Sequence, residues 1–253
     1  MKGVGAYAVL ITFLTLIGAN PYITTIVALL FRLFNLWISD RVLKMALDMK
    51  ELDDPDLIAI VNKVFSHAGL SHVKVYSTES TDYNGFAAGA NIGRSLVALT
   101  TETLKLPRDA IEGILAHEAV HVKKRDVLIG QLARIILIGI IIAGVFFVHE
   151  TLPDLLVYFA LTVVILLFPV SYSFLTQWME VRADHLGATL LDGGNAQMAK
   201  SLFNLYEFQE KAMDSYIVYD VVPKGEEKTE VAVEESNEKT YSLERESWFF
   251  RFL

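Results

Sequence analysis

Long stretches almost without charge constrain this chain more than any other feature. Between Gly3 and Ser39 the only charged residue is Arg32, and between Val127 and Val148 it is Arg134. A third stretch, Leu155–Met179, contains none. Because about 20 helical residues cross a bilayer core about 30 Å thick, the second and third stretches predict membrane-spanning helices.

The apolar stretches are expected to form two hairpins, with about four spans in all. Segment 149–154 joins the second and third stretches into one hairpin. The first stretch would measure about 55 Å as a single helix, which is too long for one crossing. Asn20-Pro21 interrupts it, because proline lacks a backbone donor, so two short spans are expected, Val4–Ala19 and Tyr22–Ile38. The alternative is a cleaved signal peptide, since Lys2 precedes the apolar run.

The positions of lysine and arginine predict the orientation in the membrane. Residues 40–126 contain eleven and the chain after Thr176 contains eight, whereas the turns at 19–21 and 149–154 contain none. Basic residues accumulate on the cytoplasmic side. We therefore expect both large polar segments in the cytoplasm of a multi-pass plasma-membrane protein that contacts lipid. Arg134 is expected to snorkel to the interface.

Composition excludes several other classes of protein. The chain has no cysteine, which excludes a disulfide scaffold, a thiol nucleophile and a cysteine-ligated metal. A net charge of −8 argues against nucleic acid as a partner. Part of this charge comes from Lys224–Glu246, which has eight Glu against four Lys or Arg and is expected to be a solvated linker.

The polar segments show the periodicities of a small α+β domain. Alternation of apolar and polar residues predicts strands at His72–Ser77 and Ser95–Thr100, and the Gly- and Asn-rich Tyr83–Gly93 predicts a loop. Helical spacing of apolar residues predicts four helices. They are Pro55–Ala68, Leu104–Arg125, Glu180–Leu191 and Ala196–Tyr216.

A His-Glu-x-x-His motif lies within the second of these helices. His117 and His121 are four residues apart, so both imidazoles can reach a single metal ion. Glu118 would lie beside the open coordination position, where it can take a proton from water and pass it to a leaving amine. The motif indicates metal-assisted peptide hydrolysis. The alternative is an amphipathic helix with two surface histidines.

A catalytic zinc ion needs a third protein ligand, and Glu180 is the best candidate. The second hairpin carries the chain across the membrane and back, to the side where His121 left it. Asp184, one turn after Glu180, can accept a hydrogen bond from a ligating histidine. The small Ala183 would let the two helices approach closely. Alternative ligands are His185, His67 and His72, while His149 falls in the opposite loop.

In this order, the motifs resemble those of the HtpX-like membrane zinc metalloprotease family, a distant relative of the CAAX prenyl proteases. The resemblance rests on Asn84–Gly89, Leu96–Thr100, HEAVH followed by Arg125-Asp126, and E-x-x-A-D from Glu180. It implies a zincin-like cytoplasmic α+β domain with a small β-sheet and one Zn²⁺ per chain. The implied zinc ligands are His117, His121 and Glu180, with Glu118 as general base. The implied role is cleavage of misfolded or damaged membrane proteins in quality control and the stress response.

The resemblance also implies how a substrate would bind. Asn84–Gly89 would border the cleft, and the strand Ser95–Thr100 would pair with the substrate backbone. The expected contacts are Asn84, Phe86, Ala87, Leu96, Val97 and Ala98. Gly85 stands where the family usually has Ala, and these 253 residues contain no Thr-His-Pro segment like the one near the family's C-terminus. Arg182 could stabilise the oxyanion instead, although a structural ion pair is the favoured interpretation.

These expectations divide the chain into five segments and leave two alternative functions open. The segments are an N-terminal transmembrane hairpin at 1–39, a catalytic segment at 40–126, a second transmembrane hairpin at 127–179, cytoplasmic helices with the third zinc ligand at 180–221, and an acidic linker and tail at 222–253. One alternative is a protease that cuts within the membrane, against which the basic cluster Lys123-Lys124-Arg125 argues. The other is a non-catalytic zinc-binding membrane adaptor.

Overall fold

The computed structural model describes residues 2–89, 94–144 and 153–221, and within these ranges the side chains of 8–211. The chain divides into two units, Met1–Asp214 and Ser215–Leu253. The second unit contributes only the end of helix α8 to the described part, so the description below concerns the first unit. The expected acidic linker and tail lie outside the described residues.

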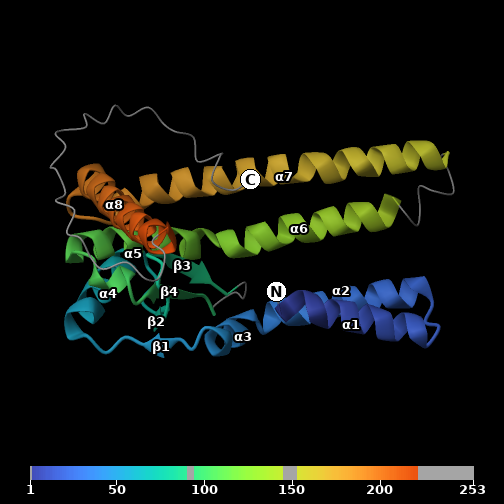
Figure 1. Cartoon of the computed structure of the whole chain (residues 1–253), viewed down its shortest axis with the longest axis horizontal. Helices are drawn as coiled ribbons and strands as arrows, with labels where there is room; N and C mark the ends of the chain where they lie inside the picture. Colours follow the sequence, from blue (N-terminus) through green and yellow to red (C-terminus); the bar gives the residue numbers. More distant parts are fainter. Residues whose placement is uncertain (1, 90–93, 145–152, 222–253) are drawn as a thin grey trace. The chain divides into compact units, whose positions relative to one another are not determined.

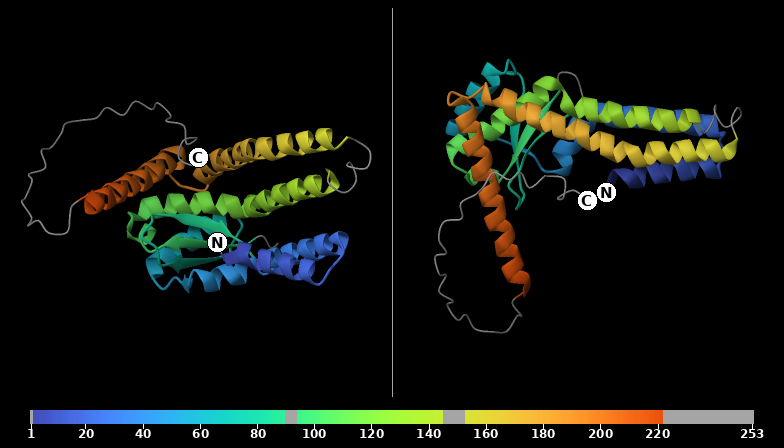
Figure 2. Two further views of the ribbon diagram at one scale, coloured as in Figure 1. Left: turned by 45° about the vertical axis from the view of Figure 1, so that its right-hand side comes forward. Right: turned by 90° about the horizontal axis from the view of Figure 1, so that it is seen from above.

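The apolar stretches form helices that pack as pairs. Helix α1 (Lys2–Leu16) packs against α2 (Pro21–Trp37), and α6 (Asp126–Ala143) runs beside α7 (Asp154–Ala188), as Figures 1 and 2 show. Asn20 caps α2, where its side chain accepts a hydrogen bond from the Tyr22 backbone N–H at 2.8 Å. The expected break at Asn20-Pro21 is therefore confirmed.

The expected count of four spans is not confirmed. Among the described residues, α6 and α7 are long and apolar enough to cross a membrane. Helices α2 and α3 (Ser39–Ala46), bent by 64° at their junction, make a third candidate if they are taken as one span. With 15 residues, α1 covers only about 22 Å, which is short of a bilayer core.

Helix α7 is longer than a membrane span and continues into the polar region. Its 35 residues extend over about 52 Å and pass through Pro169 without ending. The sequence suggested separate segments ending at Met179 and starting at Glu180, but the structure has one helix. The residues from Glu180 onward are therefore held rigidly at the end of an apolar helix.

The sheet has four strands in the order β1-β2-β4-β3. Strand β1 (Lys50–Glu51) lies antiparallel to β2 (Lys74–Thr78), and β4 (Leu96–Thr100) runs parallel to β2. Strand β3 (Gly85–Ala88) pairs antiparallel with β4, with Gly85 opposite Leu99. The prediction of a loop across Tyr83–Gly93 was therefore wrong for β3. Its four residues are too few, and three of them too small, to show alternation, so pairing with β4 defines the strand.

This topology corrects the expected site of substrate pairing. Strand β4 is bonded to β2 on one edge and to β3 on the other, so it has no edge free for a substrate. Its expected contact residues, Leu96, Val97 and Ala98, are buried. The edge of the sheet nearest the histidine helix belongs to β3 instead.

Helix α5 (Arg108–Lys124) lies between the sheet and α7 (Figure 1). It follows a short 3₁₀ turn, η1 (Thr103–Lys105), so the expected start at Leu104 was too early. It also packs against α4 (Pro55–His67), which begins at Pro55 as expected. The Asp54 side chain caps the N-terminus of α4. Burial of each large apolar side chain in this core stabilises the fold by about 1.5–3 kcal/mol. The core includes Val64, Phe65, Val97, Leu99, Ile111 and Leu115.

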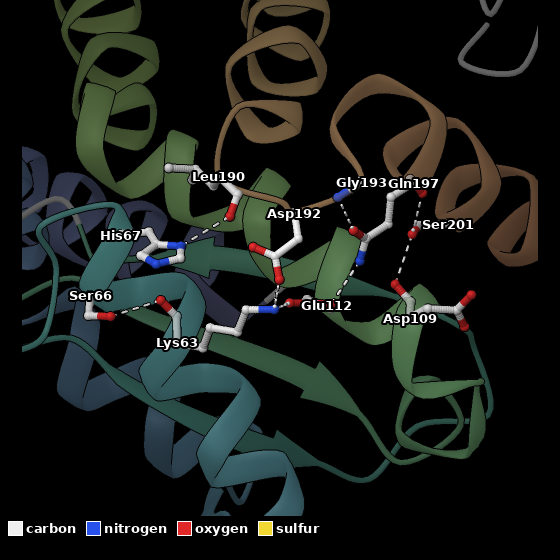
Figure 3. A network of polar contacts seen from close by, with 10 residues as sticks. All are labelled: Lys63, Ser66, His67, Asp109, Glu112, Leu190, Asp192, Gly193, Gln197 and Ser201. Atoms are coloured by element: carbon white, nitrogen blue, oxygen red, sulfur yellow. Dashed lines mark hydrogen bonds and ion pairs between the residues drawn. The ribbon is translucent and has the colours of Figure 1, made fainter.

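A polar network joins the turn between α7 and α8 (Gly194–Val221) to the domain (Figure 3). Lys63 on α4 donates to Glu112 on α5 and to Asp192 in the turn, each at 2.7 Å. Gln197 on α8 donates to the other oxygen of Glu112 at 2.7 Å. These hydrogen bonds raise the pKa of Lys63, with Asp192 the larger cause. The network thus fixes the end of the helix that carries Glu180.

Candidate metal centre

Small residues allow α7 to cross closely over α5 at the histidine motif. Ala116 and Ala183 are fully buried. A Cβ atom added to Gly187 would lie 3.2 Å from the backbone carbonyl atoms of Ala116. The expected role of Ala183 in close helix approach agrees with this packing. As a result, Glu180 and the histidine face of α5 come together.

Three of the side chains expected as zinc ligands converge. His117 Nε2 and His121 Nε2 are 2.9 Å apart, and Glu180 Oε2 lies 3.2 Å from the first and 3.6 Å from the second. Ligand atoms about 2.0–2.1 Å from a tetrahedral zinc ion would be about 3.3 Å apart. The donor set and its spacing therefore fit one zinc ion.

The alternative histidines do not join this group. In the described part of the chain, the three residues above are the one cluster of potential metal ligands found within 4.8 Å of one another. His67 does not contact the cluster. Its Nδ1 atom lies 3.4 Å from the Leu190 carbonyl oxygen instead. His149 lies outside the described residues.

Each of the two imidazoles is oriented by a carboxylate at Nδ1. His117 Nδ1 is 2.8 Å from Asp184 Oδ1, and His121 Nδ1 is 2.8 Å from Asp126 Oδ2. Donation from Nδ1–H to a carboxylate leaves the Nε2 lone pair free to bind a metal ion. The sequence predicted this role for Asp184, but not for Asp126.

Asp126 reaches His121 because of an unusual backbone conformation at Arg125. Arg125 ends α5 with φ 58° and ψ 40°, and α6 begins at the next residue. A non-glycine residue in this left-handed region costs about 1–2 kcal/mol. The Asp126 side chain is 5% exposed and also pairs with Arg182 of α7. Arg182 is therefore part of a structural ion pair, as the favoured interpretation of the sequence had it.

Hydrogen bonds among the imidazoles and the carboxylates shift the pKa of each member of the cluster. Burial lowers the pKa of His117, but hydrogen bonds to Asp184 and Glu180 outweigh it and raise the value to about 10. The pKa of His121 is likewise lowered by burial but raised overall to about 9 by Asp126 and Glu180. For Glu180, burial raises the pKa, yet the two imidazoles lower it to about 2. Metal binding near neutral pH must therefore release protons from the imidazoles.

Glu118 lies on the side of α5 that faces β3. Its side chain is buried, and burial raises its pKa despite the nearby imidazoles and a hydrogen bond from the backbone of Ala87. A carboxylate with a raised pKa is suited to accept and return a proton near neutrality. A Cβ atom at Gly85 would lie 3.6 Å from Glu118 Cγ. The edge strand and the expected general base are therefore neighbours.

The hydrogen-bond pattern shows which groups of β3 face outward. The Thr100 backbone N–H donates to the Asn84 carbonyl at 3.0 Å, so Asn84 is bonded toward β4. Because backbone groups alternate along a strand, those of Gly85 and Ala87 face the outer edge. Phe86 packs with Tyr76 on the other face of the sheet, away from α5. Of the expected substrate contacts, Ala87 thus faces the outer edge, whereas the backbone of Asn84 is bonded toward β4.

Comparison with known proteins supports the same assignment. A family model described as peptidase family M48 matches residues 51–236. A protease HtpX homolog from Desulfatibacillum aliphaticivorans is 34% identical over 143 residues, covering 53% of this chain and 46% of that protein. One from Pelotomaculum thermopropionicum is 38% identical over 112 residues, covering 43% of this chain and 40% of that protein. The matches thus span less than half of these curated relatives.

A solved structure shows the same fold at low sequence identity. The crystal structure of S. mikatae Ste24p matches with a TM-score of 0.56 and 14% identity. The match covers 83% of this chain and 56% of that one. It supports the arrangement of helices and sheet described above.

Proposed function

The chain belongs to peptidase family M48, and we propose that it is a membrane-embedded zinc endopeptidase. One observation carries the proposal. The Nε2 atoms of His117 and His121 and a carboxylate oxygen of Glu180 converge within 3.6 Å of one another. Glu118 lies on the same helix, beside an open strand edge.

The residues have separate roles in peptide hydrolysis. His117, His121 and Glu180 would hold the zinc ion, which when bound lowers the pKa of water and polarises the scissile carbonyl. Glu118 takes a proton from the attacking water through a carboxylate oxygen. As the C–N bond breaks, it returns that proton to the amine nitrogen, so protons balance over the cycle.

The edge of β3 would hold the substrate in an extended conformation. The outward backbone groups of Gly85 and the carbonyl of Ala87 can form main-chain hydrogen bonds with a peptide, which fixes it independently of its sequence, while the Ala87 N–H already donates to Glu118. The peptide would then lie over Glu118. This arrangement favours an endopeptidase over a non-catalytic adaptor.

We place the site on the cytoplasmic face of the plasma membrane, where misfolded or damaged membrane proteins would be its substrates. The distribution of lysine and arginine supports this orientation. Helix α7 supports proximity to the bilayer, since Glu180 directly follows its apolar segment. Cleavage at exposed cytoplasmic loops is favoured over cleavage inside the bilayer, because Lys123, Lys124 and Arg125 follow the motif.

Substitution of Glu118 tests the proposal. Glu118→Gln should retain zinc at one ion per chain but lose cleavage of casein, because an amide cannot take up the proton. Glu207→Gln, at an exposed ion pair on α8, is the matched control and should cleave normally. Cleavage by Glu118→Gln at the wild-type rate would show that Glu118 is not the general base.

A further inference from the structure

A pocket of about 220 Å³ adjoins the metal-ligand group at the carboxyl end of β3. One wall is formed by Ala87 and Ala88 of β3 and by Gly89, which follows the strand, and a second is the turn from Ala68 to His72. The third wall is formed by residues of the α5–α6 joint between His121 and Leu128. A peptide that extends along β3 from Glu118 must pass this pocket.

The charges that line the pocket are all of one kind. Lys123 and Arg125 contribute to its wall, and His72 also lines it. No hydrogen bond or ion pair joins either cation to another residue in the described ranges. None of the described lining residues is acidic, and the neighbouring Asp126 is already engaged by His121 and Arg182.

Acidic residues of the metal-ligand group and its surroundings are contributed by α7. They are Glu180 and Asp184, with side chains 45% and 42% exposed. On α7 these carboxylates are occupied by the imidazoles and the proposed metal ion, whereas Lys123 and Arg125 have no such partner among the described residues and can attract an anionic side chain of a bound peptide. Alternate side chains of an extended peptide project on the same face about 6.6–6.8 Å apart, so one of them can enter the pocket.

We propose that this pocket is a specificity site that binds an aspartate or glutamate side chain of the substrate. The inference rests on the proposed peptidase function and adds a preference to it. Contact of the pocket with both the β3 edge and His121 favours a peptide over an anionic lipid headgroup. The carboxylate would pair with Lys123 and Arg125, and charge-assisted hydrogen bonds of this kind are stronger than neutral ones.

Paired peptides measure the preference by cleavage. Each peptide carries Glu at one position near the scissile bond, and its partner carries Gln. For the zinc-loaded protein in nanodiscs, kcat/KM should be about tenfold higher with Glu at one position. Lys123→Ala should reduce this ratio toward one, and Lys123→Glu should reverse it in favour of the Gln peptide. Lys124→Ala is the matched control, because Lys124 is also exposed but does not line the pocket.

Binding of the same fluorescent peptides to the Glu118→Gln variant tests the pocket without cleavage. The Glu peptide should bind about tenfold more tightly than the Gln peptide, and adding Lys123→Ala should remove the difference. Equal cleavage and equal binding of both peptides would overturn the pocket assignment while leaving the protease intact. Absence of any cleavage would overturn the proposed function, and the binding ratio would still decide on the pocket.

Two further results would overturn the inference. If Lys124→Ala removed the preference as fully as Lys123→Ala, general surface charge would be responsible. If a soluble short-chain phosphatidylglycerol bound the wild-type protein in detergent but not Lys123→Ala, and no peptide preference existed, the pocket would be a lipid site.

Discussion

Replacement of Asp126 by asparagine should weaken metal binding and also destabilise the fold, for two separable reasons. The first concerns His121, whose Nδ1 lies 2.8 Å from Asp126 Oδ2. Asparagine keeps the shape but removes the charge that orients the imidazole and strengthens it as a ligand. Loss of such a carboxylate lowers metal affinity by about 10–100-fold, or about 1.4–2.7 kcal/mol.

The second reason concerns Arg182. Its side chain is 17% exposed, its partner carboxylate is 5% exposed, and its Nε atom has no hydrogen-bond partner. Removing one partner of a buried pair costs about 3–5 kcal/mol, because the remaining charge is left uncompensated. We expect about 3 kcal/mol, since the guanidinium also lies 4.4 Å from the Trp178 ring centre. The Tm should then fall by about 6–12 °C.

Two variants separate these effects. Asp126→Asn/Arg182→Gln should recover most of the lost Tm, because no charge remains unpaired, but none of the lost zinc affinity. Asp184→Asn should lose zinc affinity to a similar extent with a smaller loss of Tm, because Asp184 is 42% exposed and solvent can take its place. The assays are chelator competition for the zinc Kd and thermal unfolding of the metal-free protein in detergent.

Two results would refute this reasoning. An unchanged zinc Kd in Asp126→Asn would mean that the carboxylate does not orient His121. A double variant no more stable than Asp126→Asn would mean that the unpaired charge of Arg182 is not what destabilises the single variant.

Three further predictions follow from the packing, the pKa shifts and the topology. Gly113→Ala should lower the Tm by several degrees, because its Cβ would lie 2.3 Å from Ser201 Cβ on α8, whereas Gly139→Ala, with nothing within 4 Å, should not. The zinc-induced rise in Tm should increase from pH 6 to pH 9. The pKa values of His117 and His121 in the metal-free protein are raised to about 10 and about 9. Their protonation therefore stabilises the metal-free protein fully below the ordinary histidine pKa of about 6.5, and this stabilisation is lost as the pH rises toward the raised values. A zinc-induced rise in Tm that did not change with pH would contradict this prediction. Because the chain has no cysteine, single cysteines can be introduced for labelling in Asn20→Cys, Thr151→Cys and Lys105→Cys. The first two should react with a membrane-impermeant thiol reagent added outside the cell, and the third should not. A cysteine at position 151 that reacts only from inside would contradict the topology.

The ligand set was predictable because its members follow helical periodicity. His117 and His121 share a face of α5, and Glu180 and Asp184 share a face of α7, each pair being four residues apart. The apolar hairpin then required the two faces to lie on the same side of the membrane. Strand β3 was not predictable in this way, because its pairing with β4 is a long-range contact and its own four residues show no alternation.

Asp126 was missed for a different physical reason. It follows His121 by five residues, so on a continuous helix it would point about 140° away from that imidazole. The left-handed conformation of Arg125 ends α5 and brings Asp126 back toward His121. Arginine has no preference for this conformation, so nothing in the local sequence predicted the turn. The available signal was the Arg125-Asp126 pair, which is part of the resemblance to the HtpX-like family but did not by itself indicate a role for Asp126.

The position of Asp126 also implies that the geometry of the candidate metal site depends on the positions of the apolar helices. Helix α5 supplies the two histidines, but α6 supplies the carboxylate that orients one of them, and α7 supplies the third ligand and the other carboxylate. Both α6 and α7 continue directly from these residues into apolar segments. A shift of either helix by one turn, about 5.4 Å, would remove a ligand or its partner from distances of about 3 Å. A fragment that ends at Lys124 would therefore keep the whole HEAVH motif and yet lack Asp126, Glu180 and Asp184, so it should bind zinc weakly and cleave nothing.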